Sequence, residues 1–185
     1  MSEAAPSARP LPAEGPLGGL ESGTQALVDR QPMGSAIARL PESALSNLLV
    51  VTVGRDVGTV ADAVREADGD PTNVGVVPVS ATPVGAEAGV WTAPRVGPSD
   101  LTGVSIGIAR GMRYVQPAEG WLLFDDLGVL LMHAEESRVY QLLTTLSAKC
   151  RSRDVRGVYA LSRAAVGEGT YARFRELFDV EVGLD

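Results

Sequence analysis

The 185-residue chain has a formal net charge of -7, and hydrophobic residues make up 45% of it. No apolar run reaches the roughly 18 residues that a membrane helix needs, and the first residues lack the basic-then-apolar pattern of a signal peptide. An acidic chain is repelled by nucleic-acid phosphates and by anionic membranes. We therefore expect a cytoplasmic protein that contacts neither nucleic acid nor a membrane directly.

The use of cysteine and lysine narrows the class further. Cys150 is the only cysteine, so an internal disulfide is excluded, and no Cys/His cluster offers ligands for zinc. Lys149 is the only lysine, whereas arginine and acidic residues are abundant. Such a surface keeps its hydration when salt shortens the Debye length to about 3 Å or less. The composition therefore favours a halophilic source over the codon bias of a high-GC genome.

The chain divides at residue 23. Residues 1–23 are rich in Pro, Gly, Ala and Ser without a hydrophobic period, which is typical of a disordered tail. Over 24–185, short valine-rich runs alternate with segments of helical period. This alternation predicts one α/β domain, a three-layer αβα sandwich with a mainly parallel sheet.

The predicted elements follow from those runs in chain order. Strands are expected at 25–29, 47–53, 73–79, 121–125, 155–161 and 180–184, and helices at 35–45, 56–67, 99–114, 134–150 and 170–178. Residues 80–99 are rich in Pro, Gly and Ala and are predicted to form a long loop. Trp91 within it either anchors a partner or folds back over the sheet.

The most informative motif is a buried strand that ends in two acidic residues. Residues 121–125 read WLLFD, and Asp126 follows directly after Asp125. P-loop ATPases present their Walker-B carboxylate, which holds magnesium through water, at the end of such a strand. The motif alone is weak, because many strands of α/β proteins end in Asp where loops need turns and caps.

The order of the elements adds weight to this motif. Three segments match strands of P-loop ATPases in the same order along the chain. The segment NLLVVTVGRD resembles the strand that follows the phosphate-loop helix. The segment WLLFDDLGVLL resembles the Walker-B strand, and GVYALS resembles the strand after it. Over 24–185 the chain resembles the core of RecA-type ATPases, especially the KaiC-like and gas-vesicle-regulator-like proteins of archaea. The resemblance implies a RecA-like P-loop ATPase core topology and, with the acidic composition, a haloarchaeal family of unknown function.

The chain departs from that family at the phosphate loop. A working member needs G-x-x-x-x-G-K-[ST] after the first strand, because backbone N–H groups and the lysine surround the phosphates. Here the turn reads DRQPMGSAI, in which Gly34 and Ser35 are the only remnants and no lysine is present. Pro32 also removes one amide donor. Affinity for phosphate should be badly weakened.

The family also places a catalytic glutamate just beyond the second strand. This chain has Gly54, Arg55 and Asp56 there, and Asp56 is either a stand-in or a helix cap. Phosphoryl transfer relies on positioning and charge stabilisation, so losing both parts should abolish turnover. We therefore expect no ATPase activity. The residues of the vestigial cofactor site are predicted to be Gly34, Ser35, Asp125 and Asp126.

Other candidate residues favour structural roles. His133 is the only histidine, and Cys150 lies four to five helical turns away by the rise of about 1.5 Å per residue, too far for a catalytic dyad on one helix. A solvated histidine at a helix start is the favoured interpretation. The basic residues Lys149, Arg151, Arg153 and Arg156 either bind an acidic group or surround a helix end.

These observations lead to two functional hypotheses. The first is a catalytically inactive RecA/KaiC-like domain, without a cofactor, that acts as a regulatory or protein-interaction module in a halophilic archaeon. Its partner would be a second copy or an active RecA/KaiC-like paralogue. The alternative is a nucleotide-binding protein that senses ATP or ADP, holds ATP and magnesium weakly through Asp125 and hydrolyses little or none. A signalling role is weaker, because no phospho-acceptor pattern is evident.

Overall fold

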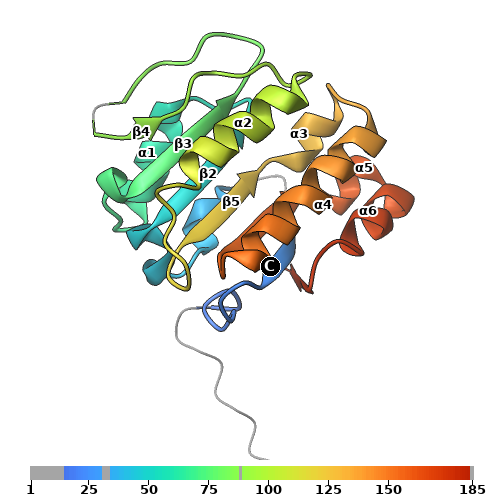
Figure 1. Ribbon diagram of the computed structural model, residues 1–185, viewed down its shortest axis with the longest axis horizontal. Coiled ribbons are helices and arrows are strands. Elements are labelled where there is room, and N and C mark those ends of the chain that lie inside the picture. Colours follow the sequence, from blue (N-terminus) through green and yellow to red (C-terminus); the bar gives the residue numbers. More distant parts are fainter. Residues whose placement is uncertain (1–14, 31–33, 88, 184–185) are drawn as a thin grey trace, which may run out of the picture.

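The protein consists of one parallel sheet between two layers of helices (Figure 1). The structure is a computed structural model that describes residues 15–30, 34–87 and 89–183. The strand order is β4-β3-β2-β5-β6-β1-β7, and every neighbouring pair is parallel. The strands are β1 (Gln25–Asp29), β2 (Leu48–Val53), β3 (Val74–Val79), β4 (Trp91–Thr92), β5 (Trp121–Asp125), β6 (Arg156–Leu161) and β7 (Val180–Gly183).

Helices connect most of these strands. The α-helices are α1 (Val57–Glu66), α2 (Leu101–Gly111), α3 (Leu127–Leu131), α4 (Glu136–Ser152), α5 (Arg163–Val166) and α6 (Glu168–Arg175). The 3-10 helices are η1 (Ala36–Arg39), η2 (Glu42–Ser46) and η3 (Pro71–Asn73). None of the helices in the described ranges is long and apolar enough to cross a membrane.

The inner strands are apolar along their whole length because both faces of the sheet are covered. Every residue of β2 and of β5 is buried. Alternate residues of a strand point to opposite faces, so Val51 packs with Leu143 in the core under α2, α3, α4 and α6. Its neighbour Val50 packs with Val60 in the core under α1, η1 and η2. The predicted three-layer α/β sandwich with a mainly parallel sheet is confirmed.

The helix predicted at 35–45 is wrong, because the segment forms two short 3-10 helices. Ser35 caps η1 by accepting a hydrogen bond from the Ile37 N–H at 3.2 Å. Leu40 then adopts an extended backbone with ψ of 148°, and Pro41 follows. A proline clashes with a helical conformation of the residue before it. Pro41 therefore divides the segment into η1 and η2.

The predicted disordered tail ends too late in the chain. Leu17 is completely buried, and Leu20 packs against the same core. The Arg156 side chain also donates from Nε to the Leu20 carbonyl at 2.8 Å. Residues 15–23 thus belong to the folded domain, whereas residues 1–14 lie outside the described residues.

The predicted long loop at 80–99 carries a short edge strand. Trp91 and Thr92 form β4 on β3, and Val96 makes a further parallel bridge to Val79. The Trp91 ring folds back over the sheet beside Gly75. Two Trp91 ring atoms lie 3.1 and 3.8 Å from the position that a Cβ of residue 75 would occupy, so the ring needs a glycine there.

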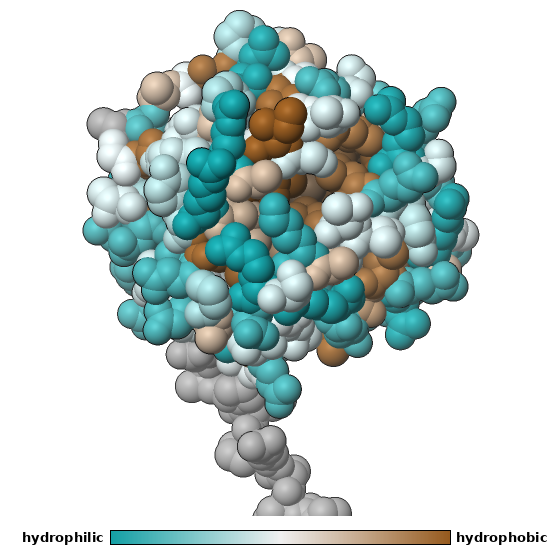
Figure 2. All heavy atoms as spheres, in the orientation of Figure 1, coloured by the Kyte–Doolittle hydropathy of each residue, from teal (hydrophilic) through white to brown (hydrophobic). Residues whose placement is uncertain are grey.

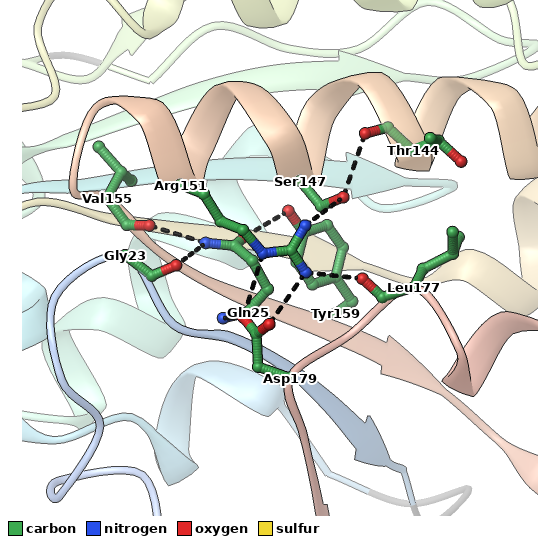
Figure 3. A network of polar contacts seen from close by, with 9 residues as sticks. All are labelled: Gly23, Gln25, Thr144, Ser147, Arg151, Val155, Tyr159, Leu177 and Asp179. Carbon is green, nitrogen blue, oxygen red and sulfur yellow. Dashed lines mark hydrogen bonds and ion pairs between the residues drawn. The ribbon is translucent and has the colours of Figure 1, made fainter.

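A buried polar network joins the start of β1 to its neighbours (Figure 3). The Gln25 amide donates from Nε2 to the carbonyls of Gly23 and Val155, both at 2.8 Å. Its Oε1 accepts from the Tyr159 hydroxyl at 2.8 Å, and its backbone N–H donates to Asp179 at 2.8 Å. Every polar atom of this buried side chain therefore has a partner, as the fold requires.

The Gln25 network predicts a specific cost for Tyr159→Phe. Loss of the hydroxyl leaves the buried Gln25 Oε1 without its donor, and an unsatisfied buried acceptor costs about 1 to 3 kcal/mol. Denaturant unfolding at constant salt measures the free energy of unfolding. The matched control is Tyr114→Phe, at a side chain that is 64% exposed, with an expected change of less than about 0.5 kcal/mol. Equal losses in the two variants would contradict this account.

Candidate functional site at the carboxyl edge of the sheet

The carboxyl ends of all the parallel strands lie at one edge of the sheet, where α/β proteins hold their ligands. Polar residues follow several of these strands within two positions. They are Arg30 after β1, Arg55 after β2, Ser80 after β3, Asp126 after β5, and Ser162 and Arg163 after β6. Asp125 is the last residue of β5, opposite Thr52 of β2, and only 3% of it is exposed.

The Arg30 guanidinium lies against both predicted carboxylates. Its Nη1 is 3.2 Å from Asp125 Oδ1 and 2.8 Å from Asp126 Oδ2, where it donates a hydrogen bond. The other terminal nitrogen, Nη2, donates to the Gly34 carbonyl at 2.9 Å. Only 10% of the Arg30 side chain is exposed, so this ion pair is largely removed from water. Arg30 therefore connects the turn after β1 to the end of β5.

A second arginine approaches Asp125 from the other side. Arg55 Nη1 lies 3.7 Å from Asp125 Oδ2. Together, Arg30 and Arg55 supply two positive charges beside the two carboxylates of Asp125 and Asp126. The site is therefore neutralised by the chain itself.

Burial raises the pKa of Asp125 to about 6. The nearby Arg30 counteracts this rise, and the negative charge of Asp126 adds to it. Three buried polar atoms at this place have no hydrogen bond within the described residues, namely Arg30 Nε, Thr52 Oγ1 and Asp125 Oδ1. The contact of Arg30 with Asp125 is thus an ion pair rather than an aligned hydrogen bond.

The four residues predicted for a vestigial nucleotide site have separate roles. Asp126 accepts from the Gly128 N–H at 2.7 Å and caps α3, in addition to binding Arg30. Ser35 caps η1, so its hydroxyl is already engaged. The Gly34 carbonyl accepts a hydrogen bond from Arg30, and the same guanidinium lies against Asp125 and Asp126. Pro32 lies outside the described residues.

Sequence reasoning missed Arg30, the residue that organises this edge. It was treated only as part of the turn after the first strand. The signal that could have found it is its position directly after β1, at the carboxyl edge of a parallel sheet, where α/β proteins hold their ligands.

The other candidates from the sequence are not part of this site. Asp56 precedes α1 without capping it, and its Oδ1 instead accepts from the Gly85 N–H at 2.9 Å. His133 is exposed beyond the end of α3. Among the described residues, no three His, Cys, Asp or Glu side chains gather as a metal site would require. Burial raises the pKa of Cys150 to about 11, so this thiol is unreactive near neutral pH.

The predicted basic patch is used internally. Arg151 donates to the Leu177 carbonyl at 2.8 Å and pairs with Asp179 at 3.2 Å. Arg153 donates to the Met112 carbonyl at 2.7 Å, and Arg156 also binds backbone carbonyls. The arginines therefore tie loops to the sheet.

A hollow of about 450 Å³ opens beside Arg30 at the ends of β1 and β6. Its wall contains Asp29 and Glu168 as well as Arg163. Arg163 is already paired with Glu181, at 2.6 Å. A phosphate group entering this hollow would meet two carboxylates and two arginines, Arg30 and Arg163, that are both already paired with carboxylates.

The raised pKa of Asp125 predicts a pH dependence. Because the folded chain holds this proton more tightly than the unfolded chain, the contribution to stability is full below about pH 4 and is lost as the pH rises to about 6. Asn at position 125 does not titrate. Between pH 4 and pH 7, the free energy of unfolding of Asp125→Asn should therefore rise relative to wild type by about 2 to 3 kcal/mol.

Asp70→Asn provides the control with the opposite sign. The pKa of Asp70 is lowered by its hydrogen bond from the Thr72 N–H, so its contribution to stability is lost as the pH falls. Denaturant unfolding across this pH range measures both differences. A constant difference between wild type and Asp125→Asn would contradict the raised pKa.

Comparison with known proteins supports the fold. A KaiC-like protein from hyperthermophilic archaea, Pyrococcus horikoshii OT3, superposes with a TM-score of 0.57 at 11% identity, over 89% of this chain and 73% of that one. Another Pyrococcus horikoshii OT3 protein superposes with a TM-score of 0.56 at 9% identity, over 90% and 84%. At such identities the likeness shows a RecA/KaiC-like fold.

The sequence comparisons give a family without a known activity. No curated protein matches the sequence. Residues 24–184 match a family of unknown function, DUF7504, and the chain belongs to this family.

Proposed function

We propose that the protein is a RecA/KaiC-like module that does not hydrolyse ATP and acts through contact with another protein. The observation that carries the proposal is the Arg30 guanidinium, which lies within 3.2 Å of Asp125 and 2.8 Å of Asp126. A magnesium ion held by Asp125 would have to share this place with a permanent positive charge. Like charges at about 4 Å repel by about 1 kcal/mol in water and more at a buried site.

The residues around Arg30 support the same proposal. Phosphoryl transfer needs groups that bind the phosphates and a residue that orients the attacking nucleophile. Arg55 lies just beyond β2, in the region where the resembling ATPases carry their catalytic glutamate, and its guanidinium stays protonated in proteins and so cannot act as a base. The acidic residue beside it, Asp56, accepts a hydrogen bond from the Gly85 N–H and is not part of this site.

The surface offers apolar groups for a protein contact. Figure 2 shows apolar residues gathered in a hollow between α2 and α4. The volume of this hollow is about 220 Å³. Ile108, Leu142 and Leu146 line it, and Ile106 of α2 is 50% exposed. Exposed apolar side chains beside a groove are typical of protein contact sites. The partner is a second copy or an active RecA/KaiC-like paralogue in the cytoplasm of a halophilic archaeon.

The absence of hydrolysis is tested by phosphate release with magnesium and ATP at molar KCl. We expect the same background rate for wild type and Asp125→Asn, because Arg30 and Arg55 already neutralise Asp125. Calorimetric titration with ATP, ADP and GTP in the same buffer should give no heat of binding. Turnover that is lost in Asp125→Asn would overturn the proposal, and binding without turnover that weakens in this variant would make the protein a nucleotide sensor.

The protein contact is tested with Ile106→Glu. Sedimentation velocity at molar KCl measures self-association, and mixing with a purified KaiC-like paralogue from the same cell measures the hetero-complex. A charge at residue 106 should weaken the complex at least about tenfold, because an unpaired charge is costly in an interface. The matched control is Ala38→Glu, at an exposed position of η1 over the opposite face of the sheet. No complex with either partner, or equal loss in both variants, would contradict the proposed contact at α2.

A further inference from the structure

We propose that a hollow at the amino ends of β2 and β3 is a binding site for a neutral carbohydrate ring. It lies at the opposite edge of the sheet from Asp125, because Leu48 and Val74, the first residues of β2 and β3, line it. Its volume is about 360 Å³, which falls in the range of small-molecule sites, about 300 to 1,000 Å³. A protein partner would bury about 800 Å² on each side, far more than this hollow offers.

Two aromatic rings form one wall of the hollow. The centroids of Trp91 and Tyr114 are 5.4 Å apart, with an angle of 53° between the ring planes. A Cβ at Gly111 would lie 3.2 Å from Trp91 and 2.5 Å from Leu49, and Gly75 likewise leaves space for the indole. The absence of a side chain at Gly75 and at Gly111 therefore leaves room for the Trp91 ring at this edge.

Hydrogen bonds between the Asn47 side chain and the backbone fix the position of Tyr114. Asn47 donates from Nδ2 to the Tyr114 carbonyl at 3.0 Å, and its Oδ1 accepts from the Gln116 N–H at 2.8 Å. The Tyr114 ring is nevertheless 64% exposed. A large aromatic ring is therefore held out at the rim by a turn that has its own hydrogen bonds.

The rim also carries polar side chains that have no partner in the described residues. They are the side chains of Ser46, Thr72, Asn73 and Gln116. Thr72 and Gln116 donate hydrogen bonds only from their backbone N–H groups, and none of the four side chains takes part in a hydrogen bond within the described residues. Hydroxyl and amide groups both donate and accept hydrogen bonds. Sugar hydroxyls do the same, so the two sets of groups complement each other.

The charge of the lining narrows the ligand class. Every lining residue is uncharged, although 21% of the chain is charged. A phosphate or carboxylate would find no counter-charge here, and burying a charge without one is unfavourable. A sugar ring offers an apolar C–H face for Tyr114 and hydroxyls for the rim. A planar base fits less well, because two rings at 53° cannot enclose it between parallel faces.

Titration with neutral sugars tests the proposal. The full chain is titrated with glucose, galactose, mannose and maltose, with adenosine and glucose 6-phosphate as comparison ligands. Tryptophan fluorescence reports binding, because Trp91 lines the hollow while Trp121 is buried in the sheet. We expect saturable binding of at least one neutral sugar with a Kd of about 1 mM or tighter, and at least about tenfold weaker binding of its phosphate ester.

Variants at the exposed ring separate stacking from unspecific effects. Tyr114→Ala should weaken sugar binding at least about tenfold, whereas Tyr114→Phe keeps the ring and should stay within about twofold. Calorimetry on the same samples gives an independent readout. No saturable sugar binding, adenosine binding in its place, or unchanged affinity in Tyr114→Ala would each overturn the proposal. These outcomes are independent of ATP hydrolysis and of the contact at α2.

Discussion

The ion pair of Arg30 with Asp125 and Asp126 is the constraint on which the carboxyl edge depends. Asp125 ends a fully buried strand, so a carboxylate there loses much of its hydration. Arg30 offsets part of this loss and joins the turn after β1 to Asp126, which also caps α3. Removing one partner of such a buried pair typically costs about 3 to 5 kcal/mol. The same guanidinium lies 3.2 Å from Asp125.

The two edges of the sheet are therefore built differently. At the carboxyl edge, Arg30 and Arg55 neutralise the acidic pair from within the chain. At the amino edge, Trp91 and Tyr114 line a neutral hollow, and four polar side chains of its rim have no partner within the described part of the chain. The sheet itself does not depend on either edge, because two apolar cores cover its faces. A RecA/KaiC-like fold can thus keep its stability while the groups at its two edges vary.

Local patterns in the sequence were sufficient for most of the strands. The strand at 121–125 was predicted with its observed bounds, since a run of apolar residues signals burial on both faces. Features that depend on distant residues were missed: Leu17 joins the core from within the predicted tail, and Arg30 and Asp126 are 96 residues apart. The acidic pair could be found from its motif. Its role could not, because that role is set by Arg30, which lies in the turn after a strand far away in the sequence.

A crystal structure grown with manganese and ADP would test the central claim most directly. Manganese replaces magnesium at oxygen ligands and is located by its anomalous scattering. Our account predicts the Arg30 guanidinium between Asp125 and Asp126 and no manganese peak beside either carboxylate. A manganese ion bonded to Asp125, with Arg30 turned away and the nucleotide phosphates in its place, would contradict the account.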